Sequence, residues 1–384
     1  MLKTTEDSMQ MFDMFRFVEQ DGLKVCINQN SQTFFDARFV SSQGSIINLH
    51  LDTLCLGYKF NTITKMTCYY PNINNLETAP LSVKGHHFLG RLKFENEEVK
   101  IIFDQLPDKA NIEKNLKSCG GYQINSKVIL EYKKAVQYSK IRDEVNCLNH
   151  FISFINGRWT AAPFIQLQNS KGTNSLLEIN TVKVQNYIKN KTWIADSSRP
   201  DLSILWSNFR KAWKDEYSRD IMKKTIHWYT EVTIEAGQVE GSIIMAQACL
   251  EMLSNYWLGE KKGILFSHDL ERISAAGKMR ILLNLLDIDI NIPDHLKSLK
   301  GYIEYFNRKN IKSDGPLLIT EYRNLLIHFT NTKKDKIKDL EILGQFKILQ
   351  LAIYYIEMSL LKILGYSGPI NNRLFVGSES LQNI

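Results

Sequence analysis

The sequence predicts an α+β protein, a mixed β-rich N-terminal domain followed by an all-α helical bundle. In the first hundred or so residues, apolar side chains alternate with a period of two, as in strands that have one solvent face. Beyond residue 200 they recur at helical spacing, with almost no alternation. A hydrophobic fraction of 44% over 384 residues excludes a disordered chain and is sufficient for the cores of two domains.

Strands and one hairpin are expected in the first part of the chain. Apolar and polar residues alternate over 35–39 and again over 47–51, which predicts half-buried strands. Two apolar sets, 92–94 and 99–103, flank the polar run 95–98. This pattern predicts a hairpin whose polar turn separates two core-facing sides.

An amphipathic helix follows the strands and is expected to pack on the sheet. Its apolar residues fall at steps of four, three, four and three: Ile141, Val145, Leu148, Ile152 and Ile155. The pair Asn156-Gly157 is a helix stop signal. Short strand-like runs return at 163–167 and 176–184, and the turn formers of 196–200 mark the best domain boundary.

The second half of the chain predicts a bundle of roughly five or six helices. Helical apolar patterns cover residues 202–209, 243–257, 279–286 and, longest of all, 340–364. Trp206, Phe209 and Trp213 have the spacing of a helix core, which favours packing over base stacking. We therefore expect an N-terminal domain at 1–195, a helical domain at 201–370 and a C-terminal tail at 371–384.

Composition and missing motifs narrow the function classes. The net charge of +7 permits an acidic partner, and six scattered cysteines without a C-x-x-C pair indicate reduced thiols in a cytoplasmic protein. The N-terminus lacks a signal-peptide pattern, and the most apolar long segment, 346–364, carries charges that argue against a membrane span. Phosphate-binding loops, dinucleotide fingerprints, H-E-x-x-H and G-x-S-x-G are absent, so neither cofactor nor metal is expected.

One constellation of chemically capable residues lies on a predicted helix after the breaker 314–316. A rotation of about 100° per residue gathers four apolar side chains in one stripe. They are Tyr322, Leu325, Leu326 and Phe329. Asn324 and His328 then share the opposite face one turn apart, where the amide can hydrogen-bond the imidazole, and Arg323 flanks them.

Ile327 falls on the same polar side of this helix. A single exposed isoleucine is ordinary, but among polar groups of catalytic type it suggests that a second subunit covers the face. A two-fold pairing would bring two copies of Arg323 and His328 together. We therefore expect a homodimer formed through the helical domain.

Arg323-Asn324-(three residues)-His328 resembles the R-x(4 to 6)-H motif of the HEPN superfamily, in which a polar residue commonly follows the arginine. The helix containing 248–253 and the long helix 340–364 are similar to those of ApeA-like HEPN proteins. The N-terminal half resembles the β-rich domain of that group. The resemblance implies a metal-independent endoribonuclease with a composite site at a dimer interface, acting in anti-phage defence by abortive infection.

The same resemblance has one informative departure. HEPN toxins that are controlled by nucleotidyltransferase antitoxins resemble R-x4-H-x-Y, with a modifiable tyrosine two residues after the histidine. Thr330 occupies that position here, so this mode of control is not expected.

The chemistry of RNA cleavage suits these residues. An imidazole can move protons near neutral pH, and a guanidinium is a planar, permanently charged phosphate ligand. We expect His328 as general base or acid, Arg323 as phosphate clamp and Asn324 as the group that orients His328 or contacts a phosphate, with a 2′,3′-cyclic phosphate product. Lys333, Lys334 and Lys336 are candidate RNA-binding residues, although charge runs of this kind are usually solvated loops.

Two other functions remain open from the sequence. The helical domain could be a non-catalytic HEPN module for RNA binding or assembly. Alternatively, the β-rich domain could bind a ligand while the helices serve as a structural tail. If the protein is a dimeric RNase, its N-terminal domain is the expected sensor of a phage or cellular trigger.

Overall fold

A computed structural model shows an α+β protein, as the sequence predicts. The structure describes residues 2–3, 23–26, 33–43, 46–57, 61–74, 79–83, 86–106, 108–170, 175–194, 200–235, 237–296, 299, 313–328 and 342–384. The chain divides into two compact units, described separately below. The sheet unit comprises Met1–Asn74, Pro80–Asn149 and Thr160–Tyr187, and the helical unit comprises Asn75–Ala79, His150–Trp159 and Ile188–Ile384.

The last division between the two units falls between Tyr187 and Ile188. This is earlier in the sequence than the expected boundary at 196–200, of which residues 196–199 lie outside the described residues. Residues 150–159, expected in the N-terminal domain, belong instead to the helical unit. Aromatic packing explains this. The ring of Phe151 lies with its centroid 4.8 Å from that of Trp206 and 5.2 Å from that of Phe209.

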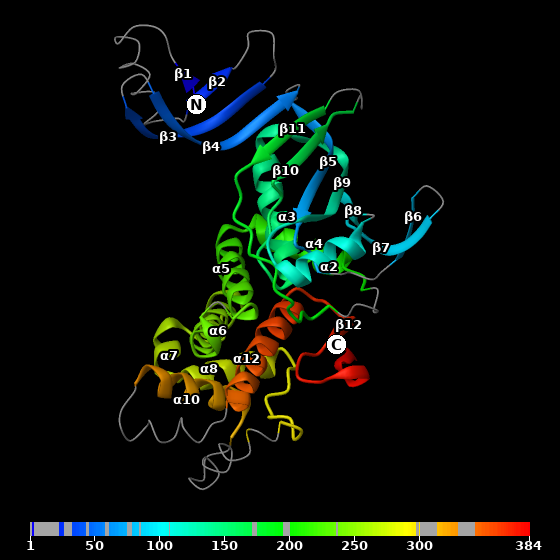
Figure 1. Ribbon diagram of the computed structural model, residues 1–384. Coiled ribbons are helices and arrows are strands. Elements are labelled where there is room, and N and C mark those ends of the chain that lie inside the picture. The colour runs from blue at the N-terminus through cyan, green and yellow to red at the C-terminus, as the bar shows by residue number, and fades with distance from the viewer. Residues whose placement is uncertain are drawn as a thin grey trace. The chain divides into compact units, whose positions relative to one another are not determined.

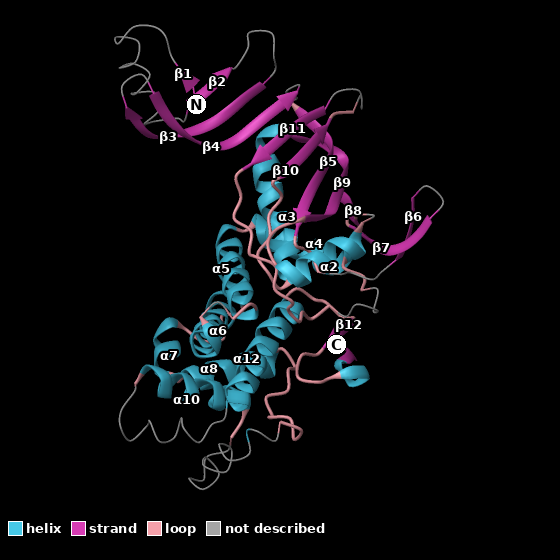
Figure 2. Cartoon of the chain, in the orientation of Figure 1, coloured by secondary structure: helices cyan, strands magenta, loops and turns pink. Residues whose placement is uncertain are grey.

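Eleven strands form one sheet among the described residues (Figures 1 and 2). They are β1 (Leu2–Lys3), β2 (Leu23–Cys26), β3 (Thr33–Gln43), β4 (Ile46–Gly57), β5 (Thr62–Pro71), β6 (Ala79–Val83), β7 (His86–Glu95), β8 (Val99–Gln105), β9 (Ile124–Gln137), β10 (Phe164–Gln168) and β11 (Ser175–Asn180). The order is β2-β3-β4-β11-β10-β5-β9-β8-β7-β6, with β1 paired to β4. The late strands β10 and β11 insert between β4 and β5 and join the two parts of the early sheet.

The predicted hairpin is confirmed as β7 and β8. Leu92 faces Phe103 and Phe94 faces Ile101 across the antiparallel pair, and all four side chains are buried. The turn is closed by Asn96, whose Oδ1 accepts hydrogen bonds from the backbone N–H groups of residues 98 and 99. A short polar side chain that binds nearby backbone in this way is typical of tight turns.

The core of the sheet unit lies on β5, between β9 and β10. Met66, Cys68 and Tyr70 on this strand are fully buried. The helices of this unit are α2 (Lys109–Cys119) and the first half of α3 (Ile141–Asn156). The Tyr70 hydroxyl donates to Asn149 Oδ1 of α3 at 2.7 Å, so the helix packs on the sheet as expected.

The end of α3 also agrees with the sequence. The helix ends at Asn156, and Gly157 follows with φ of +59°, a left-handed conformation that favours glycine. An added Cβ at this position would lie 2.8 Å from Thr192 Cγ2 and 2.9 Å from Asn190 Nδ2. Position 157 therefore requires glycine both for its backbone angle and for space.

The helical unit contains seven further α-helices among its described residues, slightly more than expected. They are α4 (Ser203–Lys214), α5 (Glu216–Thr233), α6 (Gln238–Asn255), α7 (Ser267–Arg272), α8 (Ala275–Leu285), α10 (Gly315–Ile327) and α12 (Ile342–Ile363). The central helix is α6, which packs against α5, α8, α10 and α12. Figure 1 shows these helices in green to orange. Trp206, Phe209 and Trp213 of α4 are buried, which confirms the predicted core stripe.

Residues 371–384, expected as a tail, are part of the helical unit. They contain the end of β12 (Pro369–Asn371), the 3-10 turn η4 (Gly377–Ser380) and β13 (Leu381–Asn383), which pairs with β12. Arg373 holds this segment in place through an ion pair with Glu357 of α12. In the described part of the chain, no helix combines the length and the apolar character needed to cross a bilayer.

Candidate functional site

The candidate catalytic motif lies at the C-terminal end of α10, and Asp314 fixes the start of this helix. Its Oδ1 accepts a hydrogen bond from the backbone N–H of Leu317 at 2.9 Å, a helix N-cap, and Pro316 occupies the first turn. Arg280 of α8 donates to both carboxylate oxygens of Asp314, with Nε 2.5 Å from Oδ2 and Nη2 3.1 Å from Oδ1. The start of α10 is thereby anchored to α8.

The apolar face of α10 confirms most of the predicted stripe. Tyr322 is fully buried, Leu325 is 7% exposed and Leu326 is half-buried, whereas Phe329 lies outside the described residues. Burial raises the pKa of Tyr322 above its usual range, and the carboxylate of Glu240 in the first turn of α6 raises it further. α10 packs against α6, the helix that contains Glu240.

Arg323 and Asn324 are half-buried and in contact with each other. Arg323 Nη1 donates to Asn324 Oδ1 at 3.2 Å. Arg323 Nε is buried and has no hydrogen-bond partner among the described residues, and the same is true of Thr320 Oγ1 one turn earlier. Native proteins pair most buried polar atoms, so Arg323 Nε and Thr320 Oγ1 keep unused hydrogen-bonding capacity on successive turns of α10.

His328 is exposed and occupies the position where α10 ends, with φ of −98° and ψ of 56°. Its backbone N–H donates to the carbonyl of Asn324 at 3.0 Å. The side-chain hydrogen bond expected between Asn324 and His328 does not form. The side-chain oxygen of Asn324 accepts from Arg323 instead.

The other residues weighed from the sequence have plainer surroundings. Lys333, Lys334, Lys336 and Thr330 lie outside the described residues. Glu251 of α6 accepts from Lys278 Nζ of α8 at 3.2 Å, which is an interhelical ion pair. It also accepts from Gln247 Nε2 of its own helix at 3.1 Å. Sequence reasoning did not identify Thr320 or Glu240 as neighbours of the motif, because their proximity to it depends on helix packing and burial.

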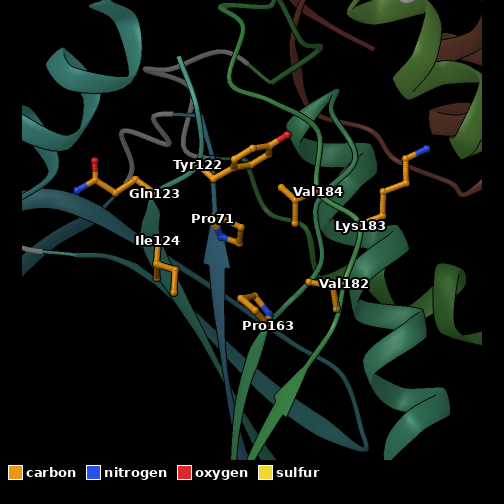
Figure 3. A pocket seen from close by; sticks show the side chains of 8 residues that line it. All are labelled: Pro71, Tyr122, Gln123, Ile124, Pro163, Val182, Lys183 and Val184. Carbon is orange, nitrogen blue, oxygen red and sulfur yellow. The ribbon is translucent and has the colours of Figure 1, made fainter. Parts of the chain in front are cut away.

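The sheet unit contains a separate pocket of about 430 Å³, which Figure 3 shows. Its walls are largely apolar, formed by Pro71, Tyr122, Gln123, Ile124, Pro163, Val182, Lys183 and Val184. The Tyr122 ring, 65% exposed, extends above Pro71 toward Val184, while the Lys183 amine points away (Figure 3). An exposed tyrosine beside two prolines can contact a ligand both through its ring and through its hydroxyl.

Two family models match parts of the chain. Residues 215–382 match the model of the YopA C-terminal domain, and residues 59–190 match that of the YopA central domain. The chain resembles YopA in both segments. The C-terminal match contains α10 and its motif, and the central match contains the sheet-unit pocket.

A curated relative bears the same name, the SPbeta prophage-derived uncharacterized protein YopA of Bacillus subtilis (strain 168). It is 27% identical over 298 residues, which make up 75% of this chain. The chain spans 64% of the length of that relative. No solved structure matches the chain.

Proposed function

We propose that the helical unit is a HEPN-type endoribonuclease domain that cuts RNA without a metal ion. The observation that carries the proposal is the end of α10. There a half-buried guanidinium with an unpaired Nε lies beside an amide, and an exposed imidazole follows at the residue that ends the helix. These are the group types needed to bind a phosphate and to move protons next to it.

The reaction balances without a further reagent. The ribose 2′-oxygen loses its proton to one His328 and bonds to phosphorus, and the bond from phosphorus to the 5′-oxygen breaks as that oxygen takes up a proton. Arg323 stabilises the charge that develops on the phosphate oxygens, and Asn324 holds the guanidinium in position. The products are a 2′,3′-cyclic phosphate and a 5′-hydroxyl.

A homodimer would complete this site. Ile327 is 44% exposed beside the motif and provides an apolar contact for a second copy. Two-fold pairing then supplies two His328 rings, one as base and the other as acid. Lys333, Lys334 and Lys336 would bind neighbouring phosphates in the same groove.

The setting of this activity is proposed to be cytoplasmic anti-phage defence by abortive infection, in the manner of ApeA-like HEPN proteins. The prophage origin of the Bacillus subtilis relative supports a role in the encounter between phage and host. The pocket of the sheet unit supports ligand binding by that unit, and we propose it as the place where a phage or cellular trigger is recognised.

RNA cleavage by the purified chain tests the proposal. With a labelled single-stranded RNA, His328→Ala and Arg323→Ala should lower the cleavage rate by about a hundredfold or more. His268→Ala and Arg272→Ala are the matched controls, because both residues are exposed elsewhere in the helical unit. Their rates should remain at the wild-type level.

The alternatives predict different results in the same assay. A non-catalytic module would bind RNA with a salt-dependent affinity but leave it intact in wild type and variants alike. Unchanged cleavage by the His328→Ala protein would remove the catalytic assignment. If the cleaved RNA carried a 3′-phosphate and no 2′,3′-cyclic phosphate formed at any time, attack by the 2′-hydroxyl would be contradicted.

A further inference from the structure

A second pocket, of about 420 Å³, opens within the helical unit. It lies where the end of α4, the start of α5, the end of α12 and the π-helix Tyr256–Lys261 after α6 meet. Its volume lies within the range of about 300–1,000 Å³ that is usual for small-molecule sites. π-Helical turns are also frequent at functional sites.

Much of the interior of this pocket is apolar. Five buried side chains from three helices form much of it: Ile221, Met222, Leu253, Leu360 and Leu364, none of them more than 8% exposed. An apolar cavity of this kind is poorly suited to water and favours an apolar guest.

The polar groups of the pocket are already paired with one another or with backbone. The hydroxyls of Ser218 and Tyr256 lie 2.7 Å apart, and Thr225 Oγ1 donates to the Ile221 carbonyl at 2.8 Å. Asn208 Nδ2 donates to the Leu364 carbonyl at 2.9 Å. These bonds reduce the hydrogen-bonding capacity that the pocket offers to the edge of a base or to a sugar, which favours hydrocarbon in the part of a ligand that enters.

The mouth of the pocket is positively charged. Lys211 of α4 and Lys261 of the π-helix line it and are exposed. The single carboxylate there, Asp215, caps α5 by accepting from the Ser218 N–H at 2.8 Å. The entrance thus has two lysines and a single carboxylate, which is already hydrogen-bonded to the start of α5. This balance of charge favours an anionic group at the entrance.

We propose that this pocket binds a fatty-acid anion, with its alkyl chain between α5, α6 and α12 and its carboxylate between Lys211 and Lys261. The apolar side chains of the interior favour the alkyl chain of the ligand, and the positive charge at the entrance favours its carboxylate. The proposal is independent of RNA cleavage, because the pocket shares no residue with the α10 motif.

Calorimetric titration of the full chain with dodecanoate, below its micelle-forming concentration, tests the ligand class. Dodecanoate should bind to one site, with at least fivefold higher affinity than methyl dodecanoate or dodecyltrimethylammonium of the same chain length. Butyrate, which has the headgroup but little chain, should not bind measurably. Equal affinity for the cationic and anionic amphiphiles, or no binding of dodecanoate, would overturn the proposal.

Substitutions then locate the site. Ala212 of α4 lines the pocket, so Ala212→Phe should fill it and weaken dodecanoate binding at least tenfold. Met222→Phe is a second filling variant, for use if circular dichroism shows that the first is unfolded. The double variant Lys211→Gln/Lys261→Gln should weaken binding at least fivefold, whereas Lys224→Gln, exposed on α5 outside the pocket, should bind as wild type.

His328→Ala separates this proposal from the proposed nuclease. It should bind dodecanoate with unchanged affinity even when RNA cleavage is lost. Wild-type affinity in a folded filling variant would show that the amphiphile binds elsewhere.

Discussion

Arg373 and Glu357 form a two-pronged ion pair in the core of the helical unit. Arg373 Nη2 lies 2.6 Å from Glu357 Oε1 and Nε lies 2.8 Å from Oε2, and each side chain is only 2% exposed. The Tyr229 hydroxyl also donates to Oε1, and Gln350 accepts from Arg373 Nη1. Both charges are therefore compensated in a place where water does not reach them.

Removing one partner of this pair should be costly. Arg373→Ala leaves the Glu357 carboxylate buried without its cation, and we expect the free energy of unfolding to fall by about 3–5 kcal/mol. The double variant Arg373→Met/Glu357→Leu should recover much of this loss. Urea denaturation measures both changes, and exposed Arg272→Ala serves as the control. A loss below about 1 kcal/mol for Arg373→Ala would contradict the prediction.

Asp314 stabilises the start of α10 in two ways that substitution can separate. Asp314→Asn keeps an oxygen for the Leu317 N–H but loses the charge pair with Arg280, and should lower the free energy of unfolding by about 1–2 kcal/mol. Asp314→Ala also loses the cap and should cost about 1 kcal/mol more. Thermal unfolding measures the difference, and equal effects of both substitutions would show that the cap contributes nothing.

Buried tyrosines of α12 should make the protein sensitive to alkaline pH. Burial raises the pKa of Tyr354 to about 12 and that of Tyr355 well above its usual value. A tyrosine in the unfolded chain titrates near 10. The folded state thus holds these protons more tightly, and its stability is complete below about pH 10 and declines as pH rises toward 12.

Tyr355→Phe provides the test of this pH dependence. The Tyr355 hydroxyl has no hydrogen-bond partner among the described residues, so its removal should cost little at pH 7. Urea denaturation from pH 7 to 11 should show a smaller loss of stability in the variant than in wild type. Tyr122→Phe, at an exposed position, should follow the wild-type curve. Parallel curves for Tyr355→Phe and wild type would contradict the prediction.

Gly157 and Gly263 form a matched pair with the same φ of +59° but different space around them. Gly263→Ala meets nothing within 4 Å and should lose only about 1–2 kcal/mol to backbone strain. Gly157→Ala would also press on Thr192 and on Asn190, whose amide holds the carbonyls of residues 156 and 157. In chemical denaturation, the free energy of unfolding should therefore fall clearly more for Gly157→Ala than for Gly263→Ala. An equal loss for the two variants would show that crowding at position 157 has no effect.

Local patterns account for what the sequence predicted well. The hairpin of β7 and β8 and the helix α3 depend on alternation, on three-four spacing and on turn residues such as Asn96 and Gly157, all within a few residues of one another. The stripe containing Tyr322 and Leu325 follows from the same helical geometry. The fold class and the buried face of α10 were therefore accessible from the chain alone.

Long-range pairing accounts for what was not predicted. The insertion of β10 and β11 between β4 and β5 joins strands that are far apart in the sequence, such as Phe164 with Tyr69, and no local pattern specifies such partners. Likewise, nothing near Arg373 in the sequence indicates Glu357 as its partner. The end of α10 at Ile327 also lacks a local signal, because neither glycine nor proline follows it, and the position of the His328 ring changes with that end.

The docking of Arg373 onto α12 has a consequence for incomplete chains. Arg373 follows Glu357 by 16 residues, so a chain that lacks the segment after α12 holds the carboxylate without its counterion. The bundle then carries an uncompensated charge in its core, and it can reach its final form only when the later segment is present.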